Sequence, residues 1–175
     1  MTDMQAEITE QPGSAAAADP TGAQAALRLD DFEAGLLPVL RHFLNSLEVP
    51  ERQGWQHAYH TAAERWGESF GLAVAYTLFT VLRAVADVRP SRLACQDALC
   101  LETRSSLTAD EAALLRMIHH MRRDQTASAR QAVAAVTGGR MDPQVIRAGL
   151  AFARRFPCGG GRAGPSASPV LRAVG

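Results

Sequence analysis

Residues 70–82 read Phe-Gly-Leu-Ala-Val-Ala-Tyr-Thr-Leu-Phe-Thr-Val-Leu and carry no charged side chain. A helix that is apolar on nearly every side is typical of the centre of a fold, on which other helices pack. The 13 uncharged residues before Arg83 fall short of the roughly 20 that are needed to cross a bilayer. The segment therefore predicts a buried core helix that ends near Arg89 and Pro90, and it predicts no membrane interaction.

Two helical patterns precede this core segment. Apolar residues recur at intervals of three and four over residues 30–48, and Asp30 or Asp31 is placed to cap the first turn. Pro38 lies inside this pattern and predicts a kink or a restart, because proline lacks the backbone N–H of a helix interior. A second helix is predicted to begin near Glu51. Its inward stripe is Trp55, Tyr59, Ala62 and Trp66.

Three further helices are predicted after the core segment. Thr108 and Glu111 form a capping box that opens the first of them. The second covers about 126–137 and ends at a pair of glycines, and the third opens with Asp142 as N-cap and Pro143 in the first turn. Residues 91–107 fit either a short helix or an extended connection. The inward positions are Leu114, Leu115, Ile118, Met121, Ala129, Ala132, Val133, Val136, Ile146, Gly149, Leu150, Ala153 and Phe156.

The pattern as a whole predicts an all-α fold, a single compact bundle of five to six helices. No strand-like alternation bounded by hairpin turns occurs, and no internal repeat occurs. The helical domain is expected to span 28–157. The arms at 1–27 and 158–175 are rich in Pro, Gly and Ala without a sustained apolar period, so we expect them to be disordered.

The composition indicates a reducing interior. Three cysteines are too few, and odd in number, for a disulfide framework. Asp3, Glu7 and Glu10 stand where a secretory signal has its basic and apolar regions. We therefore expect a cytoplasmic location. All 18 basic residues are arginine and none is lysine, a bias typical of G+C-rich genomes, and we expect a bacterial source.

Charge is distributed unevenly along the chain. Residues 1–109 hold eight Arg against fourteen acidic residues, whereas residues 110–175 hold ten Arg against four acidic residues. The formal net charge of zero therefore conceals an acidic first part and a basic second part. Such asymmetry indicates electrostatic guidance toward an acidic partner, either a protein or a nucleic acid.

The sequence offers weak candidates for chemistry. His57, His60 and Glu64 share one helix face, but that face lies opposite the apolar stripe, so we interpret it as a polar surface without a metal. Cys95 and Cys100 lack the further ligands of a zinc site, and a small apolar role is the simpler interpretation. No nucleophile motif, phosphate loop or dinucleotide fingerprint is present. We expect no enzyme activity, no metal and no cofactor.

The basic second part of the chain contains the predicted binding site. Its side chains are expected to project from the helices around residues 109–123 and 142–156 onto one surface that docks carboxylates or phosphates. The simpler alternative is a solvated arginine surface with no function. The predicted partner-binding residues are Arg116, His119, His120, Arg123, Arg147, Arg154 and Arg155.

These observations favour a small non-enzymatic helical adaptor or regulatory protein that binds an acidic protein partner. The alternative is a regulator that binds DNA or RNA through its basic C-terminal helices, since residues 131–150 loosely follow helix-turn-helix spacing. The basic region offers Phe152 and Phe156 as its aromatic residues, and both are expected on the core side. Stacking on single-stranded nucleic acid would need exposed aromatic rings. A protein partner is therefore the preferred prediction, and the oligomeric state stays open.

Overall fold

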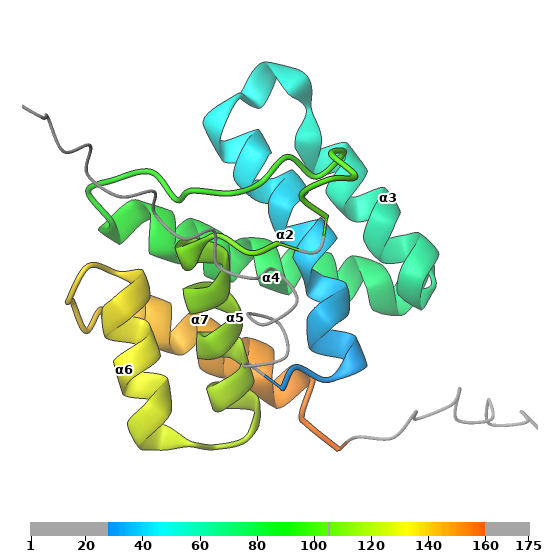
Figure 1. Cartoon of the computed structure of the whole chain (residues 1–175). Coiled ribbons are helices and arrows are strands. Elements are labelled where there is room, and N and C mark those ends of the chain that lie inside the picture. The colour runs from blue at the N-terminus through cyan, green and yellow to red at the C-terminus, as the bar shows by residue number, and fades with distance from the viewer. Residues whose placement is uncertain (1–27, 105, 160–175) are drawn as a thin grey trace, which may run out of the picture.

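A computed structural model describes residues 28–104 and 106–159 of the chain (Figure 1). Over these residues the protein consists of α-helices and one short 3₁₀ helix without strands, which confirms the predicted all-α bundle. The predicted disorder of 1–27 and of 160–175 lies outside the described residues. In chain order the elements are α2 (Asp31–Glu48), η1 (Pro50–Arg52), α3 (Gly54–Trp66), α4 (Glu68–Val88), α5 (Ala109–Arg122), α6 (Thr126–Val136) and α7 (Pro143–Arg155).

Helix α4 contains the predicted core segment and packs against α2, α3 and α7. Its inward side chains, including Leu78, have no exposed surface. The opposite side is open, since Leu72 is 45% and Tyr76 is 63% exposed, so the expectation of burial on all sides was wrong. The helix also extends well beyond the 13 uncharged residues. By length and composition alone, its 21 residues meet the requirement for a membrane-spanning helix.

Helix α2 begins with a full capping box, in which Asp30 is the predicted cap and Glu33 is its second member. The Asp30 carboxylate accepts the Glu33 N–H at 2.8 Å, and the Glu33 carboxylate accepts the Asp30 N–H at 3.1 Å. The helix then continues through Pro38 to Glu48, so the predicted restart was wrong. Proline deprives the carbonyl four residues earlier of its partner. That residue is Ala34, which lies on the exposed side of α2, where water can take the place of the missing donor.

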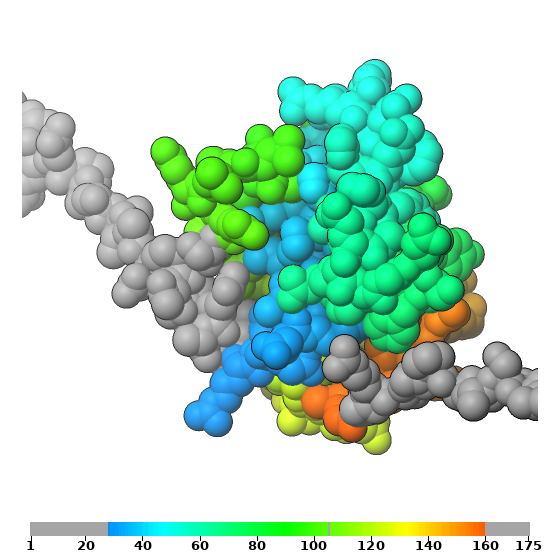
Figure 2. All heavy atoms as spheres, turned by 90° about the vertical axis from the view of Figure 1, so that its right-hand side faces the viewer, coloured from blue at the N-terminus to red at the C-terminus, as the bar shows by residue number. Residues whose placement is uncertain are grey.

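Close helix crossings place α3 between α2 and α4. A Cβ atom at Gly54 would meet the backbone oxygen of His42 on α2, and one at Gly71 would meet the backbone of Ala62 on α3. Figure 2 shows α3 and the beginning of α4 as one continuous surface beside α2, with α7 below them. Since Gly54 faces α2, the adjacent Trp55 turns outward and is 46% exposed, so its predicted inward position was wrong.

Local signals placed α5, α6 and α7 correctly. Thr108 and Glu111 form the predicted capping box. Gly138 and Gly139 follow α6 with positive φ angles of 70° and 91°, and the Asp142 side chain accepts N–H groups in the first turn of α7. The predicted inward residues of α5 and α6 are buried. On α7, Gly149, Ala153 and Phe156 are buried, whereas Ile146 and Leu150 are only partly covered.

The connection between α4 and α5 is extended with turns rather than helical, which resolves the alternative left open for 91–107. It crosses over α2 before it returns to α5 (Figure 1). Arg41 of α2 holds it in place with a fully buried ion pair to Glu111 (Nε–Oε1, 2.8 Å) and with bonds to the carbonyl oxygens of Thr103, Arg104 and Ser106. The Arg41 guanidinium thus supplies these carbonyl oxygens with the hydrogen bonds that backbone N–H groups would supply in a helix.

Candidate functional site

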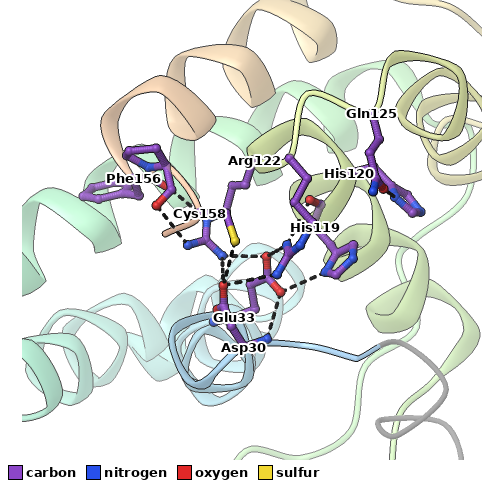
Figure 3. A network of polar contacts seen from close by, with 10 residues as sticks. Asp30, Glu33, His119, His120, Arg122, Gln125, Phe156 and Cys158 are labelled. Atoms are coloured by element: carbon purple, nitrogen blue, oxygen red, sulfur yellow. Dashed lines mark hydrogen bonds and ion pairs between the residues drawn. The ribbon is translucent and has the colours of Figure 1, made fainter. Parts of the chain in front are cut away.

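The basic side chains of α5–α7 divide into two groups with different environments. One group points inward, toward the N-terminal end of α2. There Asp30, Glu33, His119, Arg122 and Arg123 form what we call the charge cluster (Figure 3). The other group points into solvent around α6 and α7. The predicted site residues fall into both groups, so sequence position alone did not separate them.

Glu33 is at the centre of the charge cluster and has no exposed surface. Its carboxylate lies 2.9 Å from His119 Nδ1 and 2.5 Å from Arg122 Nη1, and it also accepts a hydrogen bond from Arg123. Asp30 accepts a bond from Arg122 Nη1 at 2.8 Å. The Arg122 Nε donates to the backbone oxygen of Phe156 at 2.7 Å, which brings the end of α7 into the same contact. The cluster therefore joins α2, α5 and α7.

The cluster lowers the pKa of both carboxyl groups. Burial by itself would raise the pKa of Glu33, but hydrogen bonds from Arg123, His119 and the Asp30 N–H hold it below the ordinary 4.5. Burial likewise opposes ionisation of Asp30. The Glu33 N–H and the Arg122 guanidinium outweigh that effect and hold the Asp30 pKa below 3.8. Both groups are therefore carboxylates at neutral pH, and His119 and Arg123 already face negative charge within the fold.

The other predicted site residues remain at the surface. Arg116, Arg147, Arg154 and Arg155 are exposed, and His120 is half-buried with its Nδ1 2.7 Å from Gln125 Oε1. Over the described residues, Arg116 and Arg154 take part in no ion pair or hydrogen bond. The Arg155 guanidinium lies over the Phe156 ring, 6.0 Å from its centroid. Of the predicted site residues, the exposed arginines thus lie mainly on α7, with Arg116 on α5.

Helices α6 and α7 leave an open groove because both pack on α5 and barely touch each other. The gap has a volume of about 220 Å³. Buried Met121 of α5 and Met141, which is 41% exposed, are among the residues that line it. The groove is lined mainly by apolar side chains, with a basic edge. The main lining residues are Met121, Ala129, Arg130, Val133, Ile146 and Leu150.

A second hollow of about 380 Å³ lies along the outer side of α7. Pro143, Ile146, Arg147, Leu150, Ala151 and Arg154 line it. Ile146 and Leu150 line both hollows, so the two lie next to each other along α7, and together they are called the α7 groove below. Asp124 is the one acidic residue among the residues that line it. The α7 groove therefore combines an apolar surface with exposed positive charge.

The helix-turn-helix spacing does not lead to that motif's packing. Six residues, 137–142, connect α6 to α7, whereas the motif joins two packed helices by a turn of three to four residues. In the motif the first helix supports the second, but here both rest on α5. This geometry removes the specific reason for expecting α7 to act as a recognition helix.

The other candidates for chemistry lie apart from the α7 groove. His57, His60 and Glu64 are exposed on α3, as predicted, and His60 Nε2 lies 3.1 Å from Glu64 Oε1. Across the described part of the chain, no group of three His, Cys, Asp or Glu side chains is arranged to hold a metal ion. Cys95 and Cys100 are free thiols, and the Cys95 Sγ donates to Asn45 Oδ1 at 3.1 Å.

Sequence reasoning missed the acidic half of the charge cluster. Asp30 and Glu33 stand three apart at a helix start, which is the spacing of a capping box and a usable signal. Their ion pairs with Arg122 and Arg123 join positions about ninety residues apart, and no local sequence pattern indicates such contacts. Arg130 lines the groove but is not among the predicted partner-binding residues. No protein-family model, curated protein or solved structure matches this chain.

Proposed function

We propose that the domain is a non-enzymatic adaptor or regulatory protein that binds an acidic segment of a protein partner in the α7 groove. The observation that carries the proposal is the exposed set Arg130, Arg147 and Arg154 beside the partly covered Ile146 and Leu150. Arginine pairs strongly with carboxylates, and its planar fork can bind both oxygens. A cytoplasmic location stays a prediction.

The apolar part of the α7 groove favours a protein over a nucleic acid. Amphipathic partner segments commonly bind in grooves through apolar anchors spaced three and four residues apart. Burial of such anchors provides free energy, and the arginines select a partner with carboxylates beside them. A phosphate-binding surface would gain nothing from partly covered Ile146 and Leu150.

The proposal is tested by photo-crosslinking inside the native cell. A photoreactive residue in place of Ala151, which lines the α7 groove, should crosslink to one protein with an acidic segment. The same residue in place of Gln56, exposed on α3, is the position control. The crosslinked segment should then be synthesised and its affinity for the purified full chain measured.

Charge reversal decides whether the groove is the binding site. Arg147→Glu with Arg154→Glu should weaken binding of the purified segment at least tenfold. Arg52→Glu with Arg83→Glu, two exposed arginines outside the groove, is the matched control and should change binding little. Equal effects of the two pairs would refute the proposal. A crosslink from position 151 to nucleic acid would establish the nucleic-acid alternative instead.

A further inference from the structure

The described chain starts near the helix end that supplies part of the α7 groove lining. Asp30 is held by Arg122 and Arg123 at the end of α5, with the Asp30 Oδ2 2.8 Å from Arg122 Nη1. The same helix end supplies His120 and Met121 to the lining of the groove. Residues 1–27 therefore precede a chain start that is anchored at the end of α5, the helix that also supplies part of the groove lining.

The attached segment has the charge opposite to that of the arginines in the groove. Residues 1–27 contain four acidic residues and no Arg, Lys or His. Three of the four, Asp3, Glu7 and Glu10, stand close to the apolar Met4 and Ile8. The groove offers the complementary combination, with exposed arginines next to a partly covered apolar floor. Asp19, the fourth acid, has no large apolar neighbour in the sequence.

The length of the attached segment is sufficient to reach the groove. Seventeen residues lie between Glu10 and Arg28, and a chain of that length spans at most about 60 Å. Helix α7 has 13 residues and is therefore about 20 Å long. Residues 3–10 can thus contact any part of the groove in their own chain.

We propose that residues 1–10 bind in the α7 groove of the same chain and compete with the acidic partner for it. The inference rests on the proposed function, since it assigns a built-in competitor to the same site. Covalent attachment makes the contact intramolecular, and effective concentrations of attached segments reach the millimolar range. An external acidic ligand must displace the segment, so its apparent affinity is lower than its affinity for the empty groove.

The test uses the full chain and a fluorescent synthetic peptide with the sequence of residues 1–20. Asp3→Asn, Glu7→Gln and Glu10→Gln together should release the groove, and this variant should bind the peptide at least about tenfold more tightly than the unsubstituted chain. Asp19→Asn is the matched control and should bind like the unsubstituted chain. Adding Arg147→Glu and Arg154→Glu to the released variant should abolish the gain.

A direct contact is expected in the purified full chain with a photoreactive residue in place of Ala151. Irradiation at submicromolar concentration should give an internal crosslink to residues 1–10. The inference is overturned if the released variant and the unsubstituted chain bind the peptide equally, or if the crosslink joins two chains in proportion to concentration, which would identify a second copy as the occupant. If an external segment still crosslinks and obeys the charge reversal, the proposed function stands while this inference fails.

Discussion

The buried carboxylate of Glu33 lies 2.9 Å from the Nδ1 atom of His119, although 86 positions separate the two residues in the sequence. The Glu33 carboxylate accepts the Asp30 N–H at the start of its own helix, and it also accepts a hydrogen bond from the Arg122 guanidinium of α5. The centre of the cluster is removed from water, since the side-chain exposure of Arg122 is 4% and that of Glu33 is 0%, whereas Asp30 and Arg123 at its edge are partly exposed. The attraction is therefore weakly screened, and loss of one partner leaves the others uncompensated.

Glu33→Gln should destabilise the fold by about 3–5 kcal/mol, because it leaves buried Arg122 without its nearest full negative charge. Chemical unfolding followed by circular dichroism measures this change at neutral pH. Glu64→Gln is the matched control on the exposed side of α3, and its effect should stay within about 0.5 kcal/mol. Equal effects of the two substitutions would contradict the structural role of the charge cluster.

The same variant tests the pH dependence of stability. The pKa values of Asp30 and Glu33 are lower in the folded chain than their ordinary 3.8 and 4.5. Ionisation of the two groups therefore stabilises the fold above about pH 4.5, and this contribution is lost as the pH falls through the folded pKa values. The unsubstituted chain should lose stability steeply on acidification. Glu33→Gln should show a shallower loss, and an unchanged slope would refute this assignment.

The sequence predicted those features that depend on residues close together in the chain, and it did not predict those that depend on distant residues. The capping box of Thr108 and Glu111 spans three residues, and it located the start of α5 correctly. The extended connection before α5 depends instead on the Arg41 guanidinium, more than sixty positions away. No local pattern encodes that donor, so the sequence left residues 91–107 undecided.

The candidate site shows the same limit. Helical periodicity placed both Arg123 and Arg154 on polar faces, which is correct for each helix taken alone. Tertiary packing then turned Arg123 toward Glu33 and left Arg154 at the surface. The groove itself exists because α6 and α7 both pack on α5, a relation between helices that periodicity does not contain.

Leu78→Ala should destabilise the fold by about 2–5 kcal/mol, since Leu78 is fully buried in α4 and its truncation leaves a cavity. His57→Ala is the comparison, because His57 is exposed on α3 and its removal opens no cavity. Thermal unfolding of both variants measures the difference. Similar melting temperatures would show that α4 does not form the core.

Cys95 should be the slowest of the three thiols to react with a maleimide near neutral pH. Burial, together with nearby Glu111 and Glu48, raises the pKa of Cys95 to about 11, whereas hydrogen bonds from Thr103 lower the pKa of Cys100. The thiolate is the reactive form, so the protonated Cys95 reacts slowly. Peptide mass spectrometry after timed labelling gives each rate. Unfolding the chain should bring the rates together, and fast labelling of Cys95 in the folded chain would contradict its placement.

Substitution of Arg123 should lower the stability of the fold, whereas substitution of Arg154 should weaken binding without affecting stability. Arg123→Glu places a negative charge beside Glu33 and Asp30, so it should lower the melting temperature clearly, at a cost of several kcal/mol. Arg154→Glu changes an exposed residue and should alter stability by no more than about 0.5 kcal/mol. Of the two variants, only Arg154→Glu should bind the acidic ligand of the α7 groove more weakly while keeping the melting temperature of the unsubstituted chain.

The salt dependence of the affinity gives a second measurement, because exposed charges are screened beyond about 8 Å at physiological ionic strength. Affinity of the acidic segment should fall moderately as salt rises, and Arg154→Glu should reduce that dependence. Replacement of an apolar groove residue, Leu150→Ser, should weaken binding without changing its salt dependence, since Leu150 lines the groove but carries no charge. A duplex DNA ligand would instead show a log–log slope near −0.9 for each phosphate neutralised. Insensitivity to Leu150→Ser together with such a slope would replace the protein partner with a nucleic acid.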